Sequence, residues 1–206
     1  MSMVDHLVLA TPDLAATVAE IGRLTGIDPV PGGRHPGLGT VNHLLGIGEG
    51  AYLEIIGPDP DQPAPSRPRP FEIDSLTESR LVTWSIQVED IDEAVESSRD
   101  EGYDPGTPWA MSRRMPEGGD LRWRLTLDYE HGHRGLIPFL IDWGRTPHPS
   151  AGLPVAPLVS LEAVHPEPAA IEPCLKTIGA SLQIKPGNRQ SLVATLLGET
   201  DLVVIH

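Results

Sequence analysis

A histidine and a glutamate in the first quarter of the chain have the residue types and the settings to do chemistry together. His6 lies in the stretch DHLVLATPDL (residues 5–14), and Glu54 lies in AYLEIIG (residues 51–57). Both stretches are typical of strands, in which alternate side chains share a face. His6 therefore points the same way as Val8. An imidazole and a carboxylate on facing strands can hold a metal ion or move a proton.

Each of the two residues also has a structural interpretation. A lone histidine at a strand end is more commonly hydrogen-bonded to a neighbour, and Glu54 could face solvent at a strand edge or pair with Arg34. His6 and Glu54 could also pair with each other as a buried hydrogen bond. An ionised glutamate is costly to bury without a partner, so the surroundings of this apolar strand decide between the interpretations.

The elements that must position these residues follow one pattern, which occurs three times. An apolar strand continues into a helix in VDHLVLATPDLAATVAEIGRLTG from residue 4, LVTWSIQVEDIDEAVESSRDEGY from residue 81 and LVSLEAVHPEPAAIEPCLKTIG from residue 158. Asp13 and Asp90 stand at helix N-cap positions, and Glu167 aligns with them before a third helix predicted over residues 168–178. Three strand-like stretches follow each helix. Each copy is thus predicted to be a strand–helix–strand–strand–strand (βαβββ) unit that curls into a half-barrel.

This pattern predicts the fold class α+β and divides the chain at two connectors. The predicted boundaries are a first βαβββ unit at residues 1–57, a proline-rich connector at 58–70, a second unit at 71–145, a connector at 146–157 and a third βαβββ-like unit at 158–206. We expect the three units of this 206-residue chain to form one compact structural domain.

Composition restricts the classes of partner. The formal net charge is −14 and the isoelectric point is near 4.8, which argues against binding nucleic acid or an anionic membrane. Cys174 is the single cysteine, so no intramolecular disulfide can form. The sequence shows no signal peptide and no run of 18 apolar residues. We therefore expect a cytoplasmic protein whose partner is a small molecule.

Aligning the three units shows that the histidine and the glutamate occur together only in the first. The corresponding positions hold Thr83 and Phe139 in the second unit, and Ser160 and Val204 in the third. In a curled unit, side chains of the first and last strands can face one cavity. The first unit is therefore the one predicted to carry a site.

These stretches together resemble a known family. The threefold pattern, DHLVLATPDL, GGRHPGLGTVNHLLGIG (residues 32–48) and AYLEIIG are similar to the glyoxalase-like domain family of the vicinal oxygen chelate (glyoxalase/bleomycin resistance/dioxygenase) superfamily. The likeness covers most of the chain and is strongest over residues 4–57. It implies a cupped, barrel-like mixed sheet of paired units, with helices outside and a divalent metal such as Zn, Ni, Mn or Fe in the cup. His6 and Glu54 fall at two of the family's ligand positions.

The chain departs from the family at the ligands usually taken from the second unit, because Thr83 and Phe139 are not normal metal ligands. The candidates for a third ligand are His35, His43, His131 and His133. The HGH stretch that contains the last two is better interpreted as a solvated hairpin turn. His35 could instead act as an acid or base beside Glu54.

The glycine-rich stretch is predicted to form a pocket wall, because glycines let the backbone approach a ligand closely. Within it Thr40 and Asn42 could bind a substrate carbonyl or carboxylate, and Tyr52 shares the face of Glu54. Asn42 and His43 point to opposite faces of a strand, and the resemblance favours Asn42 as the one in the cup. Four arginines of the second unit could meet a substrate anion across the cup: Arg113, Arg114, Arg122 and Arg124. An exposed sheet face explains Arg122 and Arg124 equally well.

Two classes of function follow from the resemblance. The first is a metal-dependent lyase, isomerase or dioxygenase acting on a small molecule with vicinal oxygens. In a metal-free version Glu54 would be the base, with its pKa raised by the apolar strand. The second is a non-catalytic protein that binds or sequesters a small molecule, which the loss of second-unit ligands favours. The resemblance also implies a homodimer.

Overall fold

The chain is described by a computed structural model that covers residues 3–115, 118–127 and 135–206. Its elements follow the predicted order. The first unit contains β1 (Val4–Ala10), α1 (Leu14–Thr25), β2 (Val30–His35), β3 (Thr40–Gly48) and β4 (Ala51–Pro58). The second contains β5 (Arg80–Gln87), α2 (Ile91–Asp100), β6 (Trp109–Arg114), β7 (Asp120–Leu125) and β8 (Phe139–Asp142). The third contains β9 (Leu158–His165), α3 (Glu172–Thr177), β10 (Gln183–Pro186), β11 (Ser191–Leu197) and β12 (Leu202–Ile205).

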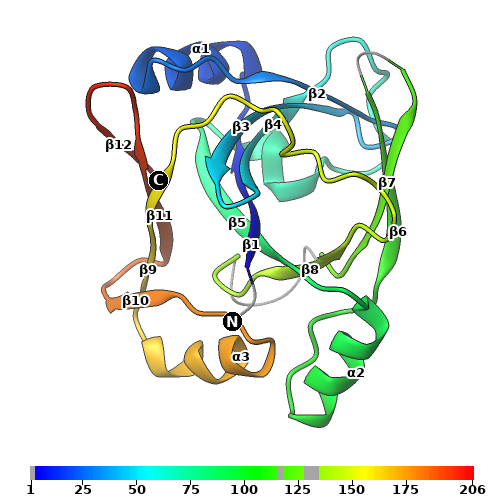
Figure 1. The fold of residues 1–206 in the computed structure, drawn as a ribbon, viewed down its shortest axis with the longest axis vertical. Helices are drawn as coiled ribbons and strands as arrows, with labels where there is room; N and C mark the ends of the chain where they lie inside the picture. Colours follow the sequence, from blue (N-terminus) through cyan, green and yellow to red (C-terminus); the bar gives the residue numbers. More distant parts are fainter. Residues whose placement is uncertain (1–2, 116–117, 128–134) are drawn as a thin grey trace.

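The first two units close into one barrel, in the strand order β1-β4-β3-β2-β6-β7-β8-β5 (Figure 1). Within each unit the first and last strands run parallel, as β1 with β4 and β5 with β8. The units meet at two antiparallel seams, between β1 and β5 and between β2 and β6. The α+β fold class and the barrel-like pairing of units are confirmed.

The caps of the two long helices are those that the sequence predicts. The Asp13 carboxylate accepts a hydrogen bond from the backbone N–H of Ala16, and the Asp90 carboxylate accepts two, from Asp92 and Glu93. The helix α1 ends at Gly26, whose φ of 76° is the left-handed conformation that glycine adopts most readily.

Strand alternation gives the barrel two apolar faces. One cluster fills the lumen, and the other covers the outside of β1, β4 and β5. The lumen cluster includes Val8, Ala10, Ile56, Phe139 and Ile141. The outer cluster includes Leu7, Leu9, Leu53, Ile55 and Trp84. Burying each of the Val, Leu, Ile and Phe side chains among them contributes about 1.5–3 kcal/mol, which fixes the register of β1 and β4.

The third unit forms a separate four-stranded sheet that packs on the outer face of the barrel. Its buried residues, among them Leu192 and Leu196, belong to the same core cluster as Leu7 and Trp84. Its strand order is β10-β9-β11-β12, so the first strand lies inside the sheet rather than at the edge as in the other two units. Because both edges of β9 are paired within the unit, it needs no neighbouring unit to protect it.

The short elements fall in or beside the connectors and in the third unit. A 3-10 segment, η1 (Pro70–Ser75), follows the proline-rich stretch, and η2 (Pro168–Ala170) precedes α3. No helix in the described part of the chain is long and apolar enough to cross a membrane.

Candidate functional site

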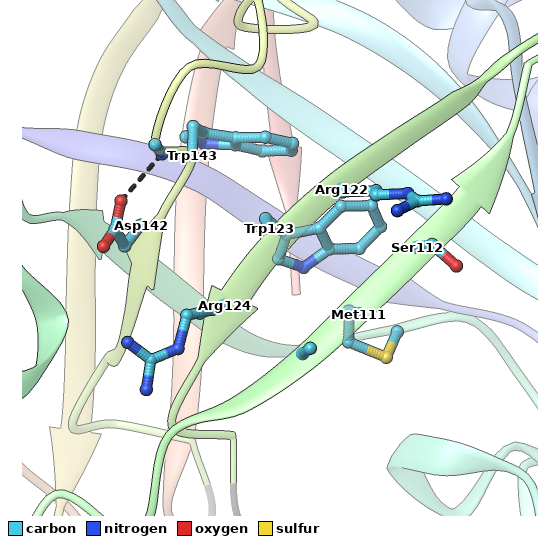
Figure 2. Close-up of a pocket in the computed structure, with 9 residues that line it drawn as sticks. Met111, Ser112, Arg122, Trp123, Arg124, Asp142 and Trp143 are labelled. Atoms are coloured by element: carbon cyan, nitrogen blue, oxygen red, sulfur yellow. Dashed lines mark hydrogen bonds between the residues drawn. The ribbon is translucent and has the colours of Figure 1, made fainter.

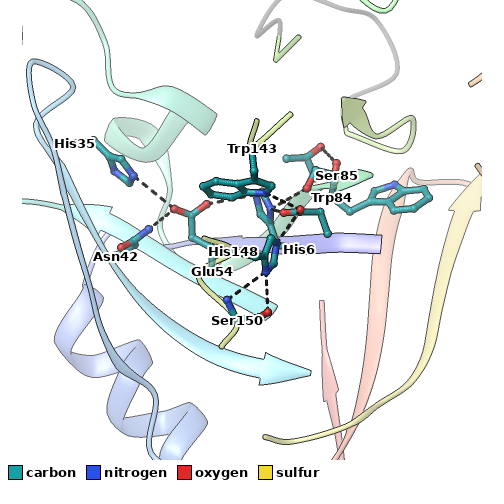
Figure 3. A network of polar contacts seen from close by, with 11 residues as sticks. His6, His35, Asn42, Glu54, Trp84, Ser85, Trp143, His148 and Ser150 are labelled. Atoms are coloured by element: carbon teal, nitrogen blue, oxygen red, sulfur yellow. Dashed lines mark hydrogen bonds and ion pairs between the residues drawn. The ribbon is translucent and has the colours of Figure 1, made fainter. Parts of the chain in front are cut away.

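The polar residues of the lumen gather around Glu54, whose carboxylate lies between two imidazoles (Figure 3). The parallel register of β1 and β4 places His6 opposite Tyr52 and Val8 opposite Glu54. The Nε2 atom of His6 is 3.9 Å from Oε2 of Glu54, and the Nε2 atom of His35 is 3.8 Å from Oε1. All three side chains are buried. The two imidazoles therefore present the same ring nitrogen to one carboxylate.

The other ring nitrogen of His6, Nδ1, is fixed by two polar neighbours. This nitrogen lies 2.6 Å from Oδ1 of Asp5 and 2.8 Å from the hydroxyl of Ser85. The ring of Tyr52 stacks on the His6 ring, with centroids 4.7 Å apart, and Phe139 packs edge-on. Since a carboxylate only accepts hydrogen bonds, Nδ1 of His6 is the donor to Asp5.

Asp5 is the buried anion of the site. The indole Nε1 of Trp143 donates to its Oδ2 at 2.8 Å, and Nε2 of His148 lies 2.9 Å from the same oxygen. Burial alone would raise the pKa of the Asp5 carboxyl, but the hydrogen bonds to His148 and His6 more than offset this and hold the pKa well below its ordinary value. Asp5 is therefore ionised at neutral pH, and it orients the ring of His6.

His35 is anchored by a residue that the sequence predicts to bind substrate. Its Nδ1 lies 3.0 Å from the hydroxyl of Thr40, and the ring of Trp123 approaches it edge-on. Burial lowers the pKa of His35, although the charge of Glu54 acts in the opposite direction. At neutral pH the ring is therefore neutral.

Asn42 links Glu54 to a buried arginine. Its Nδ2 donates to Oε1 of Glu54, and its Oδ1 accepts a hydrogen bond from Nη1 of Arg113 at 3.0 Å. The orientation of the amide is unambiguous, because a carboxylate only accepts and a guanidinium only donates. Arg113 is thus a lumen residue, whereas Arg124 on β7 pairs at the surface with Asp92.

The structure brings six of the predicted site residues together in the lumen: His6, His35, Thr40, Asn42, Tyr52 and Glu54. His43 pairs with Ile55 on the outer face of the barrel, and its Nδ1 is buried without a hydrogen-bond partner. His131 and His133 lie outside the described residues. Arg34 pairs with Asp59 and Asp61 instead of Glu54.

Three residues of the site were missed by sequence reasoning: Asp5, Ser85 and His148. Arg113 was named only as one of four arginines that could meet a substrate anion. Asp5 is adjacent to His6, and strict alternation would place it on the outer face. The β1–β5 pairing has a register shift between Val4 and His6, and this irregularity accompanies the inward position of Asp5. His148 lies in the second connector, where a sequence pattern gives no contact to β1.

The donor types suit a divalent transition metal, but the described residues provide only part of a site. Because metal–ligand bonds are about 2.0–2.2 Å long, two ligands of one ion can lie nearly 4 Å apart. The distances from Glu54 to His6 and from Glu54 to His35 would therefore each allow the two side chains to bind one ion. Among residues 3–115, 118–127 and 135–206, no group of three or more His, Cys, Asp or Glu is placed to hold a metal ion. An ion bound by His6 and Glu54 would need further donors, from substrate or water.

Two cavities flank the buried cluster. One, of about 470 Å³, is walled by Trp123 and Trp143, whose ring centroids are 5.2 Å apart (Figure 2). Because Trp143 bonds to Asp5 and Trp123 packs on His35, the two indoles separate this cavity from the histidines. The other, of about 670 Å³, is lined by Arg113 and His148, which both bond to residues of the site, so it reaches the cluster through polar groups.

Comparison with known proteins gives a family and a fold. The model of the glyoxalase-like domain family matches residues 4–179. A hypothetical protein from Staphylococcus aureus superposes with a TM-score of 0.66 at 14% identity, covering 98% of this chain and 83% of the other.

Methylmalonyl-CoA epimerases give weaker superpositions. The enzyme from Streptomyces coelicolor has a TM-score of 0.48 at 18% identity, covering 69% of this chain and 97% of its own. The enzyme from Mycobacterium tuberculosis has a TM-score of 0.46 at 16% identity, covering 70% and 88%. No curated protein sequence matches the chain.

Proposed function

Because the chain belongs to the glyoxalase-like domain family, matched over residues 4–179, we propose that it is an enzyme acting on a small oxygenated molecule, with Glu54 as the residue that moves a proton. The observation that carries this proposal is the setting of the Glu54 carboxylate. It is buried between two anchored imidazoles, and it is oriented by a single amide.

The two oxygens of Glu54 have different surroundings, which suits a base. Oε1 accepts the hydrogen bond from Asn42, whereas Oε2 accepts none from any described residue. Oε2 would take a proton from a carbon next to a carbonyl, the electron pair of the broken C–H bond moving onto the carbonyl oxygen. Return of the proton to the same carbon would complete an epimerisation. Return to the former carbonyl carbon would complete an isomerisation of a 2-hydroxy ketone, once the hydroxyl proton of the first carbon has moved to the former carbonyl oxygen.

His35 is the group that would stabilise the charge developing on the substrate oxygen. We assign the Thr40 hydroxyl as the donor to Nδ1, so that the neutral ring carries its proton on Nε2, the atom that faces the carboxylate. A neutral imidazole can donate a hydrogen bond from Nε2 to the substrate oxygen without giving up its proton. In this proposal Thr40 positions His35, Asn42 positions Glu54, and Tyr52 positions His6. The main role of Thr40, Asn42 and Tyr52 is this positioning rather than contact with the substrate.

A divalent metal at His6 and Glu54 is the second arrangement that an observation favours. Hydrogen bonding of the second ring nitrogen to a carboxylate, as between His6 and Asp5, is the usual setting of a metal-binding histidine. When bound, an ion such as Zn, Ni, Mn or Fe would polarise the substrate oxygens as a Lewis acid. His6 and Glu54 would hold it, and Asp5 would keep Nε2 of His6 free for it.

Hydrogen exchange in D₂O tests the proposal. The protein would be incubated with a panel of 2-hydroxy ketones, 2-hydroxy acids and 2-oxo acids, and loss of the proton next to the carbonyl would be followed by ¹H NMR. We expect exchange with at least one compound, which Glu54→Gln abolishes. Glu20→Gln on the exposed face of α1 is the matched control. Equal exchange in wild type and Glu54→Gln would remove Glu54 from the chemistry.

Metal content separates the two arrangements. Elemental analysis of protein purified without a metal-affinity tag would compare wild type with His6→Ala and Glu54→Ala. Near-stoichiometric metal that both variants lose would establish the ligand pair. Ligand binding without exchange, in protein loaded with each metal in turn, would instead favour the non-catalytic binding protein of the same fold.

A further inference from the structure

Arg113 is a buried cation without an anionic partner of its own. The residue is 5% exposed, and its one hydrogen bond to another described side chain runs from Nη1 to the amide oxygen of Asn42. No carboxylate of a described residue lies within ion-pair distance of it. A guanidinium has five N–H donors, and a buried arginine is almost always paired. Arg113 therefore has donors to spare in the lumen.

The backbone of β2 is shaped to hold this side chain. A Cβ atom on Gly32 would lie 2.3 Å from Nη1 of Arg113, and one on Gly33 would lie 2.8 Å from Cγ of the same residue. The two glycines thus form a slot along which the arginine runs. Because the slot exists only without side chains there, the GG pair and the position of Arg113 depend on each other.

Arg113 borders a cavity of suitable size and charge. Arg113 lines the cavity of about 670 Å³, which lies within the range typical of small-molecule sites. Arg145 and His148 also line it, and the one carboxylate among its described lining residues, Asp120, is paired with Arg114. The rest of the wall is largely apolar. In a chain of net charge −14, a cavity lined by two arginines, Arg113 and Arg145, selects an anionic ligand with an apolar body.

We propose that Arg113 binds the carboxylate of a small organic acid in this cavity. With Nη1 engaged by Asn42, the Nε and Nη2 donors remain, and this side of the guanidinium matches the two oxygens of a planar carboxylate. Asn42 connects the anchor to Glu54, so one amide side chain would separate the guanidinium that holds the ligand from the proton-moving group. The inference rests on the proposed function only in assigning the reacting end of the ligand to Glu54.

Equilibrium binding in the intact chain tests the anchor without turnover. The probes are 4-fluorobenzoate, its neutral analogue 4-fluorobenzamide and 4-fluorophenyl phosphate, titrated at constant ionic strength and followed by ¹⁹F NMR. We expect the wild type to bind the benzoate at least about tenfold more tightly than the benzamide, the loss typical of one charge-assisted contact. Equal binding of these two probes would overturn the proposal, and tighter binding of the phosphate would overturn the choice of a carboxylate.

Variants test whether Arg113 causes the preference for the benzoate over the benzamide. Arg113→Met should remove it, and Arg113→Lys should retain part of it, because lysine keeps the charge but loses the paired donors. Arg124→Gln, on the neighbouring strand β7 and outside this cavity, is the matched control and should bind like wild type. Thermal melts would establish that each variant is folded. An unchanged preference in folded Arg113→Met would overturn the proposal.

The same probes distinguish this inference from the proposed function. Glu54→Gln should keep the preference for the benzoate while losing exchange chemistry, because the carboxylate is held by Arg113 and not by Glu54. Loss of exchange in Glu54→Gln with no carboxylate preference in wild type would leave the proposed function standing and this inference refuted.

Discussion

At the scale of single residues, the lumen is a chain of polar groups in which each depends on its neighbour. Asn42 is its clearest link, because one amide satisfies both Glu54 and Arg113. Buried polar groups are tolerated when they are hydrogen-bonded, and they become costly when a partner is removed.

Replacing Asn42 by leucine should therefore destabilise the protein although it adds apolar volume. Asn42→Leu leaves Oε1 of Glu54 and Nη1 of Arg113 without their partner, which we expect to lower the free energy of unfolding by about 1–3 kcal/mol. Urea denaturation measures this, with Asn188→Leu in the exposed turn before β11 as the control. A variant as stable as wild type would mean that the two charged groups find other partners.

His43 gives a second prediction, in the pH dependence of stability. Burial lowers its pKa in the folded protein below the ordinary 6.5, and its Nδ1 has no partner. The unfolded chain therefore binds more protons as pH falls through about 6.5, so this residue costs stability on acidification. His43→Leu should be at least as stable at pH 8, and its advantage should grow towards pH 5.

Denaturant unfolding at pH 8, 6.5 and 5 would measure the difference between wild type and His43→Leu. His35, whose pKa burial also lowers, is present in both proteins, so its contribution cancels. A stability difference that stays constant over this range would contradict the role assigned to His43.

Residue type and strand alternation predicted much of the site, and the remainder has physical reasons. His6 and Glu54 could be found because a polar residue in an apolar strand stands out. Asp5 could not, because an irregular register overrides alternation, and His148 reaches it from a connector. Arg113 was visible only as one of several arginines on strands, since its burial depends on the glycine slot of a different unit.

At the scale of elements, β2 has the strictest demands. It joins the first unit to the second, through the pairing of Arg34 with Arg114 on β6. At this seam Gly33 has a φ of +154°, and a Cβ there would lie 2.2 Å from the carbonyl oxygen of Arg114. That obstacle is backbone, so it cannot turn away as a side chain would.

Gly33→Ala should therefore weaken the barrel more than a glycine substitution at an open turn. We expect a loss above the roughly 1–3 kcal/mol that a strained backbone conformation costs, because the seam must also open. Gly37→Ala is the control: its φ is +79°, but nothing lies within 4 Å of the added Cβ, and about 1–2 kcal/mol is expected. Thermal denaturation of both variants would compare them, and equal losses would contradict the clash.

The element boundaries follow the sequence where capping and periodicity agree, and depart from it where proline intervenes. The helices after Asp13 and Asp90 begin as predicted. The third, expected over residues 168–178, is instead a 3-10 turn followed by the short α3, and Glu167 makes no side-chain cap. Pro173 lacks the N–H that a continuous helix needs beyond its first turn, whereas Pro168 stands at the first position, where no N–H is needed.

At the scale of the whole molecule, the outer cluster makes the stability of the third unit and that of the barrel depend on each other. The apolar cluster outside the barrel is continuous with the buried face of the third sheet, so neither surface is covered without the other. We propose that the three units unfold as one cooperative domain, as the predicted boundaries imply. The alternative is that the third unit melts first and leaves a folded barrel.

The positions of the tryptophans allow a direct test of this cooperativity. Trp109, Trp123 and Trp143 belong to the cluster inside the barrel, whereas Trp84 lies in the outer cluster that the third sheet shares, so in a Trp84→Phe background the near-ultraviolet tryptophan signal reports on the barrel alone. Leu196 on β11 is fully buried in the shared cluster, whereas its neighbour Leu197 is 47% exposed. Leu196→Ala should cost about 2–5 kcal/mol and Leu197→Ala less than about 0.5 kcal/mol.

If the domain is cooperative, a cavity made in the third sheet must lower the melting temperature reported by the three tryptophans inside the barrel. We expect Leu196→Ala to shift the near-ultraviolet and far-ultraviolet transitions down together, and Leu197→Ala to leave both in place. An unchanged tryptophan transition, with a separate early loss of far-ultraviolet signal, would mean that the barrel is stable alone. The third unit would then be an attachment to the barrel that holds the site, rather than a part of its core.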